Sequence, residues 1–248
     1  MKALVLCGGE GKRLRPLTYY FQKTMIPIGI RQKPLLEYIV RLLRHHHIRD
    51  ITLLVGYKAE QIINYFEDGS RFNVNVSYSE DVPELKGTGG SLLNAYNNGF
   101  IDEEDQVIIY YGDIISSINL TELIKQHINN GAMATVALAQ GYELPVGVAQ
   151  ISNDHRITGF IEKPSYEKPV SIGILAINGE ALRHLKELSS THEGLDIMRH
   201  LIPSLIEKGE LVYGYILDSF WYDVGTTERY EKIDNGQIEK IFNFLLFE

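Results

Sequence analysis

The chain has 248 residues, and its 24 Lys and Arg against 32 Asp and Glu leave a formal net charge of −8 at pH 7. A hydrophobic content of 44% with 23% charged residues is typical of a globular protein and not of a disordered one. The acidic balance argues against a nucleic-acid or membrane partner, because phosphate-bearing surfaces attract basic proteins. No stretch approaches the roughly 20 apolar residues of a spanning helix. Cys7, the only cysteine, excludes an internal disulfide and indicates a reducing compartment, so we expect a cytoplasmic protein.

Strands and helices alternate in the first half of the chain. Apolar and β-branched runs predict strands at 3–6, 51–55, 74–78 and 107–111, and apolar residues at helical spacing predict helices at 34–48, 58–66 and 91–98. Such alternation predicts an α/β fold, with a Rossmann-like, mostly parallel sheet and helices on both faces. Ligands bind these sheets at the carboxyl ends of the strands.

The second half is less regular. We expect a helix at 120–129, a strand at 134–138, an antiparallel hairpin of 146–151 and 157–161, a strand at 172–177, helices at 179–188 and 195–207, a strand at 211–216 and a helix from 227 onward. No linker rich in Pro, Ser or Gly divides the chain. We therefore expect one α/β domain over 1–248, with an antiparallel elaboration.

A glycine-rich, basic loop follows the first strand. Gly8, Gly9 and Gly11 let the backbone approach a ligand and turn its N–H groups toward an anion. Lys12 and Arg13 add positive charge, so the loop is suited to a triphosphate. A basic turn without any ligand is the alternative interpretation.

Two better-known phosphate loops do not fit this segment. A dinucleotide fingerprint would need glycine where Leu14 stands, and a P-loop would need glycine at Leu6. Residues 1–33 nevertheless hold seven Lys or Arg against one acid in a chain that is acidic overall. A compact anionic ligand is therefore expected here.

Seven short motifs follow one another along the chain: GGEGKRLRPLT at 8–18, KTM at 23–25, GTGG at 87–90, GD at 112–113, GV at 147–148, EKP at 162–164 and WYDVGT at 221–226. In order and separation they resemble the motifs of the nucleotide-sugar pyrophosphorylases, the sugar-1-phosphate nucleotidyltransferases. The resemblance implies a GT-A-like nucleotidyltransferase fold with a nucleotide-binding part at 1–113, a sugar-phosphate-binding part at 114–226 and a C-terminal helix at 227–248. The sequence has no hexapeptide repeats, so we do not expect the C-terminal β-helix domain that some members of this family carry.

Asp113 and Asp223 are the candidate metal ligands. Asp113 follows an apolar strand and a glycine, which places its carboxylate at the ligand-binding edge of the sheet. Asp223 has a similar setting, and two carboxylates with nucleotide phosphates and waters would complete the octahedron of Mg²⁺, the expected cofactor. A cap or turn role is the alternative for either aspartate alone.

The resemblance assigns the remaining roles. Arg13, Lys23 and Asp113 would be catalytic. The nucleotide would contact Leu6, Gly8, Gly9, Gly11, Lys12, Arg13, Gly87 and Thr88, and the sugar phosphate would contact Gly147, Glu162, Lys163 and Ser171. A helix N-terminus is the alternative role for Gly87 and Thr88.

The implied reaction converts an NTP and a sugar 1-phosphate into an NDP-sugar and pyrophosphate. The segment at 87–90 is most similar to guanylyltransferases acting on mannose 1-phosphate, so GTP and a mannose-type sugar are expected. A glucose-1-phosphate thymidylyl-, uridylyl- or cytidylyltransferase and a non-catalytic nucleotide-sugar-binding regulator are the alternatives. Tyr111 and Ser171 differ from the residues frequent beside the sugar in this family, which leaves the sugar open. A metal-dependent glycosyltransferase is disfavoured because the chain has no Asp-x-Asp triplet.

Two further features concern assembly and metal binding. The apolar C-terminal segment would either pack on the domain's own helices or form a subunit interface, and the resemblance favours a homo-oligomer. The run His45, His46, His47 does not predict a metal site, because successive helical positions point about 100° apart.

Overall fold

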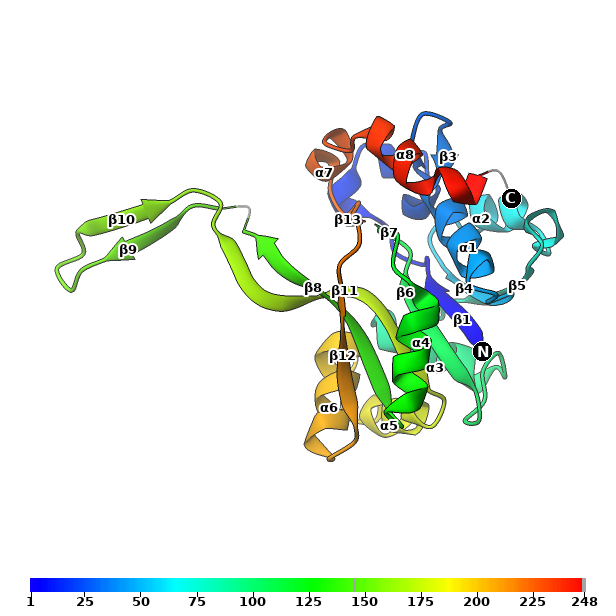
Figure 1. Ribbon diagram of the computed structural model, residues 1–248. Helices are drawn as coiled ribbons and strands as arrows, with labels where there is room; N and C mark the ends of the chain where they lie inside the picture. Colours follow the sequence, from blue (N-terminus) through cyan, green and yellow to red (C-terminus); the bar gives the residue numbers. More distant parts are fainter. Residues whose placement is uncertain (145, 247–248) are drawn as a thin grey trace.

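A seven-stranded sheet in the order β12-β8-β11-β6-β1-β4-β5 forms the centre of the protein in a computed structural model, which describes residues 1–144 and 146–246 (Figure 1). Its strands are β1 (Lys2–Leu6), β4 (Asp50–Val55), β5 (Asn75–Glu80), β6 (Gln106–Tyr111), β8 (Ala134–Glu143), β11 (Ser165–Asn178) and β12 (Val212–Leu217). Neighbouring strands are parallel, except that β11 runs antiparallel to both β6 and β8. The predicted α/β fold with a mostly parallel sheet is confirmed.

Helices cover both faces of this sheet and enclose two cores. One core includes α1 (Leu35–His45), α2 (Ala59–Phe66), α4 (Leu120–Asn129) and α8 (Asn235–Leu246), and the other includes α3 (Gly87–Asn97), α5 (Ala181–Ser189) and α6 (Ile202–Glu207). The remaining elements are α7 (Thr227–Glu231) and the short antiparallel pairs β2 (Pro27–Ile28) with β3 (Lys33–Pro34), β7 (Ile114–Ser116) with β13 (Trp221–Asp223), and β9 (Val148–Ile151) with β10 (Ile157–Ile161).

The apolar run of β1 shows why the first half folds as predicted. Ala3 and Val5 lie in one core and Leu4 in the other, all fully buried, because successive residues of a strand point to opposite faces of the sheet. Burying such a valine or leucine side chain contributes about 1.5–3 kcal/mol. A sheet buried on both faces therefore requires continuous apolar strands, and this is the pattern that the sequence has.

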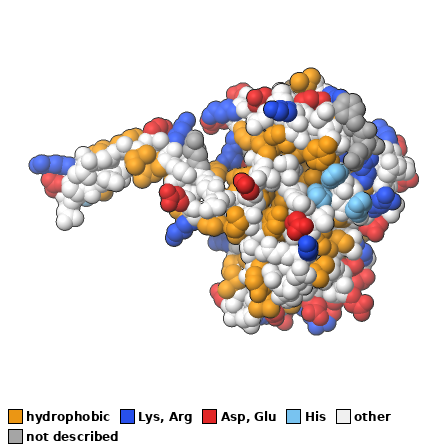
Figure 2. Space-filling model, in the orientation of Figure 1, with side chains coloured by type: hydrophobic (Ala, Val, Ile, Leu, Met, Phe, Trp, Pro, Cys, Tyr) orange, Lys and Arg blue, Asp and Glu red, His pale blue; other side chains and the backbone are white. Residues whose placement is uncertain are grey.

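The β9–β10 hairpin leaves the body of the molecule. We call residues 146–163 the arm; they project away from the sheet (Figure 1), and apolar side chains lie along their surface (Figure 2). Val146, Ile151, Ile157 and Phe160 are 58%, 63%, 66% and 60% exposed. β8 and β11 extend beyond their predicted bounds because they pair with each other at the base of the arm, where Ser165 lies opposite Glu143.

Several helices differ from the prediction. α3 begins at Gly87 rather than at residue 91, with Gly87 at a φ of 84°, and a Cβ there would lie 2.2 Å from the carbonyl oxygen of Leu195. The single helix expected from 227 is two helices, because the Asp234 carboxylate accepts the N–H groups of Gly236 and Gln237 and starts α8 anew. The predicted helix at 195–207 begins as a π-helical turn, Ile197–Leu201, before α6.

The apolar C-terminal segment packs on the chain's own α1. Ile238, Phe242 and Leu245 of α8 are buried, and the Phe242 ring meets the edge of the Tyr38 ring with 5.7 Å between centroids. Residues 247–248 of that predicted helix, like residue 145 of the hairpin, lie outside the described residues. The homo-oligomer stays a prediction. Within the described residues no helix is both long and apolar enough to cross a bilayer.

Candidate active site

A cavity of about 300 Å³ opens at the carboxyl ends of β1, β5 and β6, which is where ligands bind in this architecture. Its lining includes most of the residues assigned to the nucleotide: Leu6, Gly8, Gly9, Gly87 and Thr88, together with Lys23 and Asp113. Gly11, Lys12 and Arg13 border a neighbouring cavity of about 380 Å³, which Lys23 also lines. The structure therefore brings the predicted nucleotide residues into two adjoining cavities.

Lys23 is held by a residue that sequence analysis did not select. Gln22 is fully buried, and its side-chain amide donates to the carbonyl oxygen of Cys7 just after β1. Its side-chain oxygen accepts from the backbone N–H of Thr24 at 2.5 Å, which caps the short helical turn that begins with Lys23. Lys23 in turn forms an ion pair with Asp113. Gln22 therefore fixes the lysine relative to the end of the sheet.

The two candidate metal ligands are neighbours. Asp113 precedes β7 and Asp223 ends β13, and these strands pair so that the N–H of Val224 donates to the carbonyl oxygen of Asp113 at 2.8 Å. Burial raises the pKa of Asp223, and the nearby Asp113 carboxylate raises it further, while Arg229 and Lys23 oppose the shift. Two carboxylates held this close destabilise each other unless cations accompany them.

One oxygen of Asp223 fits a cation ligand. Asp223 Oδ2 forms an ion pair with Arg229, whereas Oδ1 is buried and has no hydrogen-bond partner in the described part of the chain. A buried acceptor without a donor is costly, and beside a second carboxylate it suits a hard divalent cation such as Mg²⁺. No group of three or more His, Cys, Asp or Glu able to hold a metal occurs among the described residues. Further ligands would therefore come from the nucleotide or from water.

Two of the residues predicted to bind the sugar phosphate, Lys163 and Ser171, line cavities that adjoin the same carboxylates. A cavity of about 490 Å³ includes Ser171 with Tyr111, Asp113 and Asp223 in its lining. Another, of about 690 Å³, is lined by Arg13, Lys163 and Asp223, among others. Tyr111 and Asp113 therefore border both the nucleotide cavity and the cavity that holds Ser171.

The arm separates two predicted sugar ligands from these cavities. Gly147 and Glu162 are not among the described residues that line them. A Cβ on Gly147 would lie 2.4 Å from the Phe160 ring and 2.8 Å from Glu162 Oε2, so these residues contact one another on the arm. Lys163, at the base of the arm, does reach the site.

Three further residues line the cavity that Lys163 borders and were not selected as site residues from the sequence. Arg229, in α7, pairs with Asp223 and also donates to the hydroxyl of Tyr142. The rings of Tyr142 and Trp221 are stacked, with 6.4 Å between centroids. Arg229 lies just beyond the last motif, where an isolated arginine carries no sequence signal. Aromatic faces of this kind are suited to the apolar face of a sugar ring.

The hydroxyl of Thr88 forms hydrogen bonds within the protein. It accepts the N–H of Ile197 at 3.0 Å and donates to Asp196 at 3.0 Å. Thr88 lines the nucleotide cavity, but its polar group joins α3 to the loop before α6. Any contact with a nucleobase at this position would come from its backbone or methyl group.

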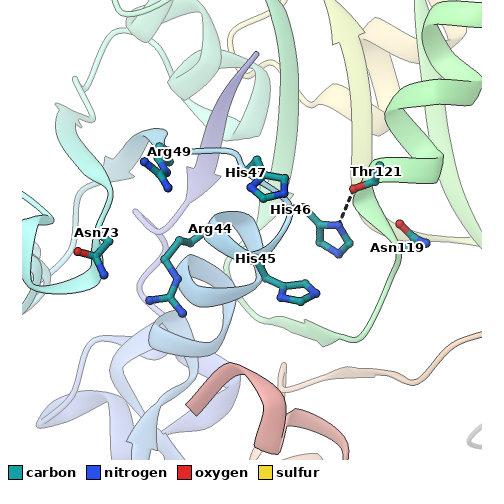
Figure 3. Close-up of a pocket in the computed structure, with 8 residues that line it drawn as sticks. All are labelled: Arg44, His45, His46, His47, Arg49, Asn73, Asn119 and Thr121. Carbon is teal, nitrogen blue, oxygen red and sulfur yellow. Dashed lines mark hydrogen bonds between the residues drawn. The ribbon is translucent and has the colours of Figure 1, made fainter. Parts of the chain in front are cut away.

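The histidine run borders a separate, open cavity of about 800 Å³ near the start of β4 (Figure 3). Its lining includes Arg44, His45, His46, His47 and Arg49, and the labelled histidine rings point in different directions. His46 Nδ1 lies 2.8 Å from the hydroxyl oxygen of Thr121. The rings do not converge on one point, but helical spacing is not the reason, because α1 ends at His45 rather than at the predicted residue 48 and His47 has a φ of 62°.

Residues 2–240 match the model of the nucleotidyl transferase family. The chain belongs to this family. A Synechocystis sp. protein named UTP–glucose-1-phosphate uridylyltransferase is 31% identical over 97% of this chain, which spans 64% of that relative's length. The D-glycero-alpha-D-manno-heptose 1-phosphate guanylyltransferase of Aneurinibacillus thermoaerophilus is 31% identical over 94% of this chain and 96% of its own.

A solved structure has the same fold as this chain. The Bacillus anthracis protein, provisionally named a glucose-1-phosphate thymidylyltransferase and crystallised with sucrose, superposes with a TM-score of 0.78 and 24% identity, over 98% of this chain and 99% of that one. The predicted family and fold are both confirmed.

Proposed function

We propose that the chain transfers a nucleotidyl group from an NTP to a sugar 1-phosphate, releasing pyrophosphate and forming an NDP-sugar, with Mg²⁺ as cofactor. The observation that carries this proposal is the position of Asp113, which borders the nucleotide cavity and the cavity holding Ser171. Two substrates in these cavities would meet at Asp113. Family membership supports the same reaction class.

The reaction needs positioning more than proton transfer. A phosphate oxygen of the sugar 1-phosphate attacks the α-phosphorus, a P–O bond forms, and the bond to the β-phosphate breaks with its electron pair leaving on pyrophosphate. Because the nucleophile is already an anion, no general base is required. The main barrier is repulsion between two anionic substrates, and fixed positive charge lowers it.

Each charged residue has a role in this scheme. Lys23 would neutralise the nucleotide phosphates beside Asp113, and Arg13 would stabilise the departing pyrophosphate. Lys163 would hold the phosphate of the sugar from the cavity that it shares with Arg13. Asp113 and Asp223 would hold Mg²⁺, which when bound supplies Lewis-acid charge to phosphate oxygens.

The finer assignment is GTP and a mannose-type sugar. It is supported by the GTGG segment and by the heptose 1-phosphate guanylyltransferase that is similar over nearly its whole length. The relative named as a uridylyltransferase makes UTP the second candidate. The predicted homo-oligomer and cytoplasmic location belong to this proposal.

The test follows pyrophosphate release from purified protein incubated with Mg²⁺, each NTP in turn and a panel of sugar 1-phosphates. We expect release only when both substrates are present, and none after EDTA. Asp113→Asn serves as the matched inactive control. Tight nucleotide-sugar binding without pyrophosphate release under any pairing would replace this proposal with the non-catalytic regulator.

A further inference from the structure

The lining of the nucleotide cavity combines an ion pair, Lys23 with Asp113, and a second carboxylate, Asp81, which pairs with neither of them. Asp81 and Ser91 line one part of it, whereas Lys23 connects it to the cavity with Lys12 and Arg13. Triphosphate oxygens are attracted to the basic end and repelled by a carboxylate. A nucleotide in this cavity therefore has its phosphates toward Lys23 and its base toward Asp81.

Asp81 is held in place by the backbone around it. It follows β5, and its N–H donates to the carbonyl oxygen of Val55 at 2.7 Å. A Cβ on Gly8 would lie 1.9 Å from Asp81 Oδ2, and one on Gly56 would lie 2.7 Å from it. Only glycines at these two positions leave room for the carboxylate.

The carboxylate keeps free acceptor capacity. Oδ1 accepts the hydroxyl hydrogen of Ser91 at 2.6 Å, and Oδ2 accepts no hydrogen bond from the described part of the chain. An ionised carboxylate has two oxygens with about four acceptor positions and no donor. Asp81 is also solvent-exposed, so a ligand can reach it.

An acceptor-only group discriminates among nucleobases. Guanine presents two adjacent donors, N1–H and the 2-amino group, which suit both oxygens of one carboxylate. Adenine and cytosine place an unprotonated ring nitrogen beside their amino group, and uracil and thymine place carbonyls on both sides of N3–H. Each of these would set a lone pair against a carboxylate oxygen, which costs affinity.

We infer that Asp81 selects the nucleobase and that the base it selects is guanine. This inference rests on the proposed function only in taking the cavity as a nucleotide site. The competing role for Asp81 is purely structural, since its bond to Ser91 also fastens the first turn of α3. The two roles predict different behaviour toward modified bases.

The test measures nucleotide dissociation constants by calorimetry for the wild type, Asp81→Asn and Ser91→Ala, using GTP, ITP, XTP, ATP, UTP, CTP and dTTP. For the wild type we expect GTP to bind about tenfold to hundredfold more tightly than ITP, which lacks the 2-amino group. Asp81→Asn should lose that preference and gain affinity for XTP. The asparagine amide can donate to the 2-oxo group of xanthine while its oxygen accepts N1–H.

The matched control and the outcomes separate the two roles. Ser91→Ala removes the internal hydrogen bond that would give Asp81 a purely structural role but keeps the carboxylate, so its order of base preference should match the wild type. Equal affinity of the wild type for GTP and ITP, or an unchanged base order in Asp81→Asn, overturns the inference. If Asp81→Asn does not fold, the comparison of GTP with ITP on the wild type still decides.

Failure of the proposed function gives a different result. GTP binding with the expected preference but no pyrophosphate release would leave the role of Asp81 intact and remove the catalytic proposal. Turnover with UTP or dTTP as readily as with GTP would leave the catalytic proposal intact and remove the role of Asp81 in selecting guanine.

Discussion

The predicted nucleotide-binding part, residues 1–113, and the arm carry similar apolar residues, but these residues are buried in the first and exposed in the second. Leu53 of β4 is fully buried between neighbouring strands, whereas Ile157 of β10 is 66% exposed on a two-stranded hairpin. A hairpin of two strands is at best marginally stable on its own, whereas a sheet of many strands with covered faces is stable. The residues predicted to bind the nucleotide therefore lie on the well-packed central sheet. Only the residues predicted to bind the sugar phosphate include some, Gly147 and Glu162, that lie on the arm.

This contrast extends to the site residues. The residues assigned to the nucleotide lie in adjoining cavities, as do Lys23 and Asp113. Of the residues assigned to the sugar phosphate, Lys163 and Ser171 reach the site, while Gly147 and Glu162 remain on the arm. Nucleotide recognition should consequently depend on the fold of the body, and sugar recognition on where the arm lies.

The largest expected effect is at Asp113, which borders both the predicted nucleotide cavity and the cavity that holds Ser171. Asp113→Asn should lower turnover by about 10²–10³-fold, because it weakens the proposed site for the cation that would act on the reacting phosphates and leaves the packing intact. Steady-state kinetics measure the loss, and an unchanged thermal midpoint shows that the fold is retained. Full activity in this variant would mean that the two cavities do not meet at a catalytic centre.

The next largest difference should be in how much a truncated side chain destabilises the central sheet and the arm. Leu53→Ala should lower the free energy of unfolding by about 2–5 kcal/mol, because it leaves a cavity in the core. Ile157→Ala, on the arm, should change it by no more than about 0.5 kcal/mol. Urea denaturation of both variants measures the difference. Similar losses would show that the arm is covered in solution.

Substrate affinity should divide along the same line. Arg13→Ala should weaken NTP and pyrophosphate binding and Lys163→Ala should weaken sugar 1-phosphate binding, each by about 1.5–3 kcal/mol for a charge-assisted contact. Michaelis constants for both substrates in both variants provide the check. If each variant weakens both substrates equally, the nucleotide and sugar sides are not separate.

The smallest effect concerns pH. Burial, and then the neighbouring His45, lowers the pKa of His46 from 6.5 to about 4 in the folded protein. The unfolded chain therefore binds a proton at a higher pH than the folded one, and stability should be complete above pH 6.5 and fall as the pH drops toward 4. His46→Gln should flatten this dependence in urea midpoints measured across that range. An identical slope in the variant would assign the acid sensitivity to other groups.

The central sheet could be predicted from the sequence because strands that are buried on both faces have continuous apolar sequences. Continuous apolar runs such as β1 can form only inner strands of a covered sheet. The position of the arm cannot be predicted in this way, since two strand-like runs at 146–151 and 157–161 on either side of the turn-like Asn153-Asp154 predict a hairpin equally well whether it is covered or exposed. The early start of α3 was missed because the glycines at 87–90 are poor helix formers, and a tertiary contact with Leu195 overrides that preference.

The candidate site was predictable only where charge and motif coincide. Lys23 and Asp113 stand in motifs and meet in space. Gln22, Asp81 and Arg229 have roles that arise from what folding places beside them, respectively Cys7, Gly8 and Asp223. A buried glutamine or an isolated arginine cannot be distinguished in sequence from its many structural counterparts.

The ion pairs of Asp113 with Lys23 and of Asp223 with Arg229 mean that this protein carries its own counter-ions. A divalent cation that binds the two carboxylates would have to compete with Lys23 for Asp113, whereas at Asp223 it would meet the unpartnered Oδ1; a cation alone would leave the lysine uncompensated. A nucleotide alone would draw Lys23 away and leave Asp113 facing phosphate oxygens. A metal–nucleotide complex would satisfy both groups at once, because the cation would take the place of Lys23 at Asp113 and the phosphates would take the place of Asp113 at Lys23, so binding of metal and of nucleotide should each strengthen the other.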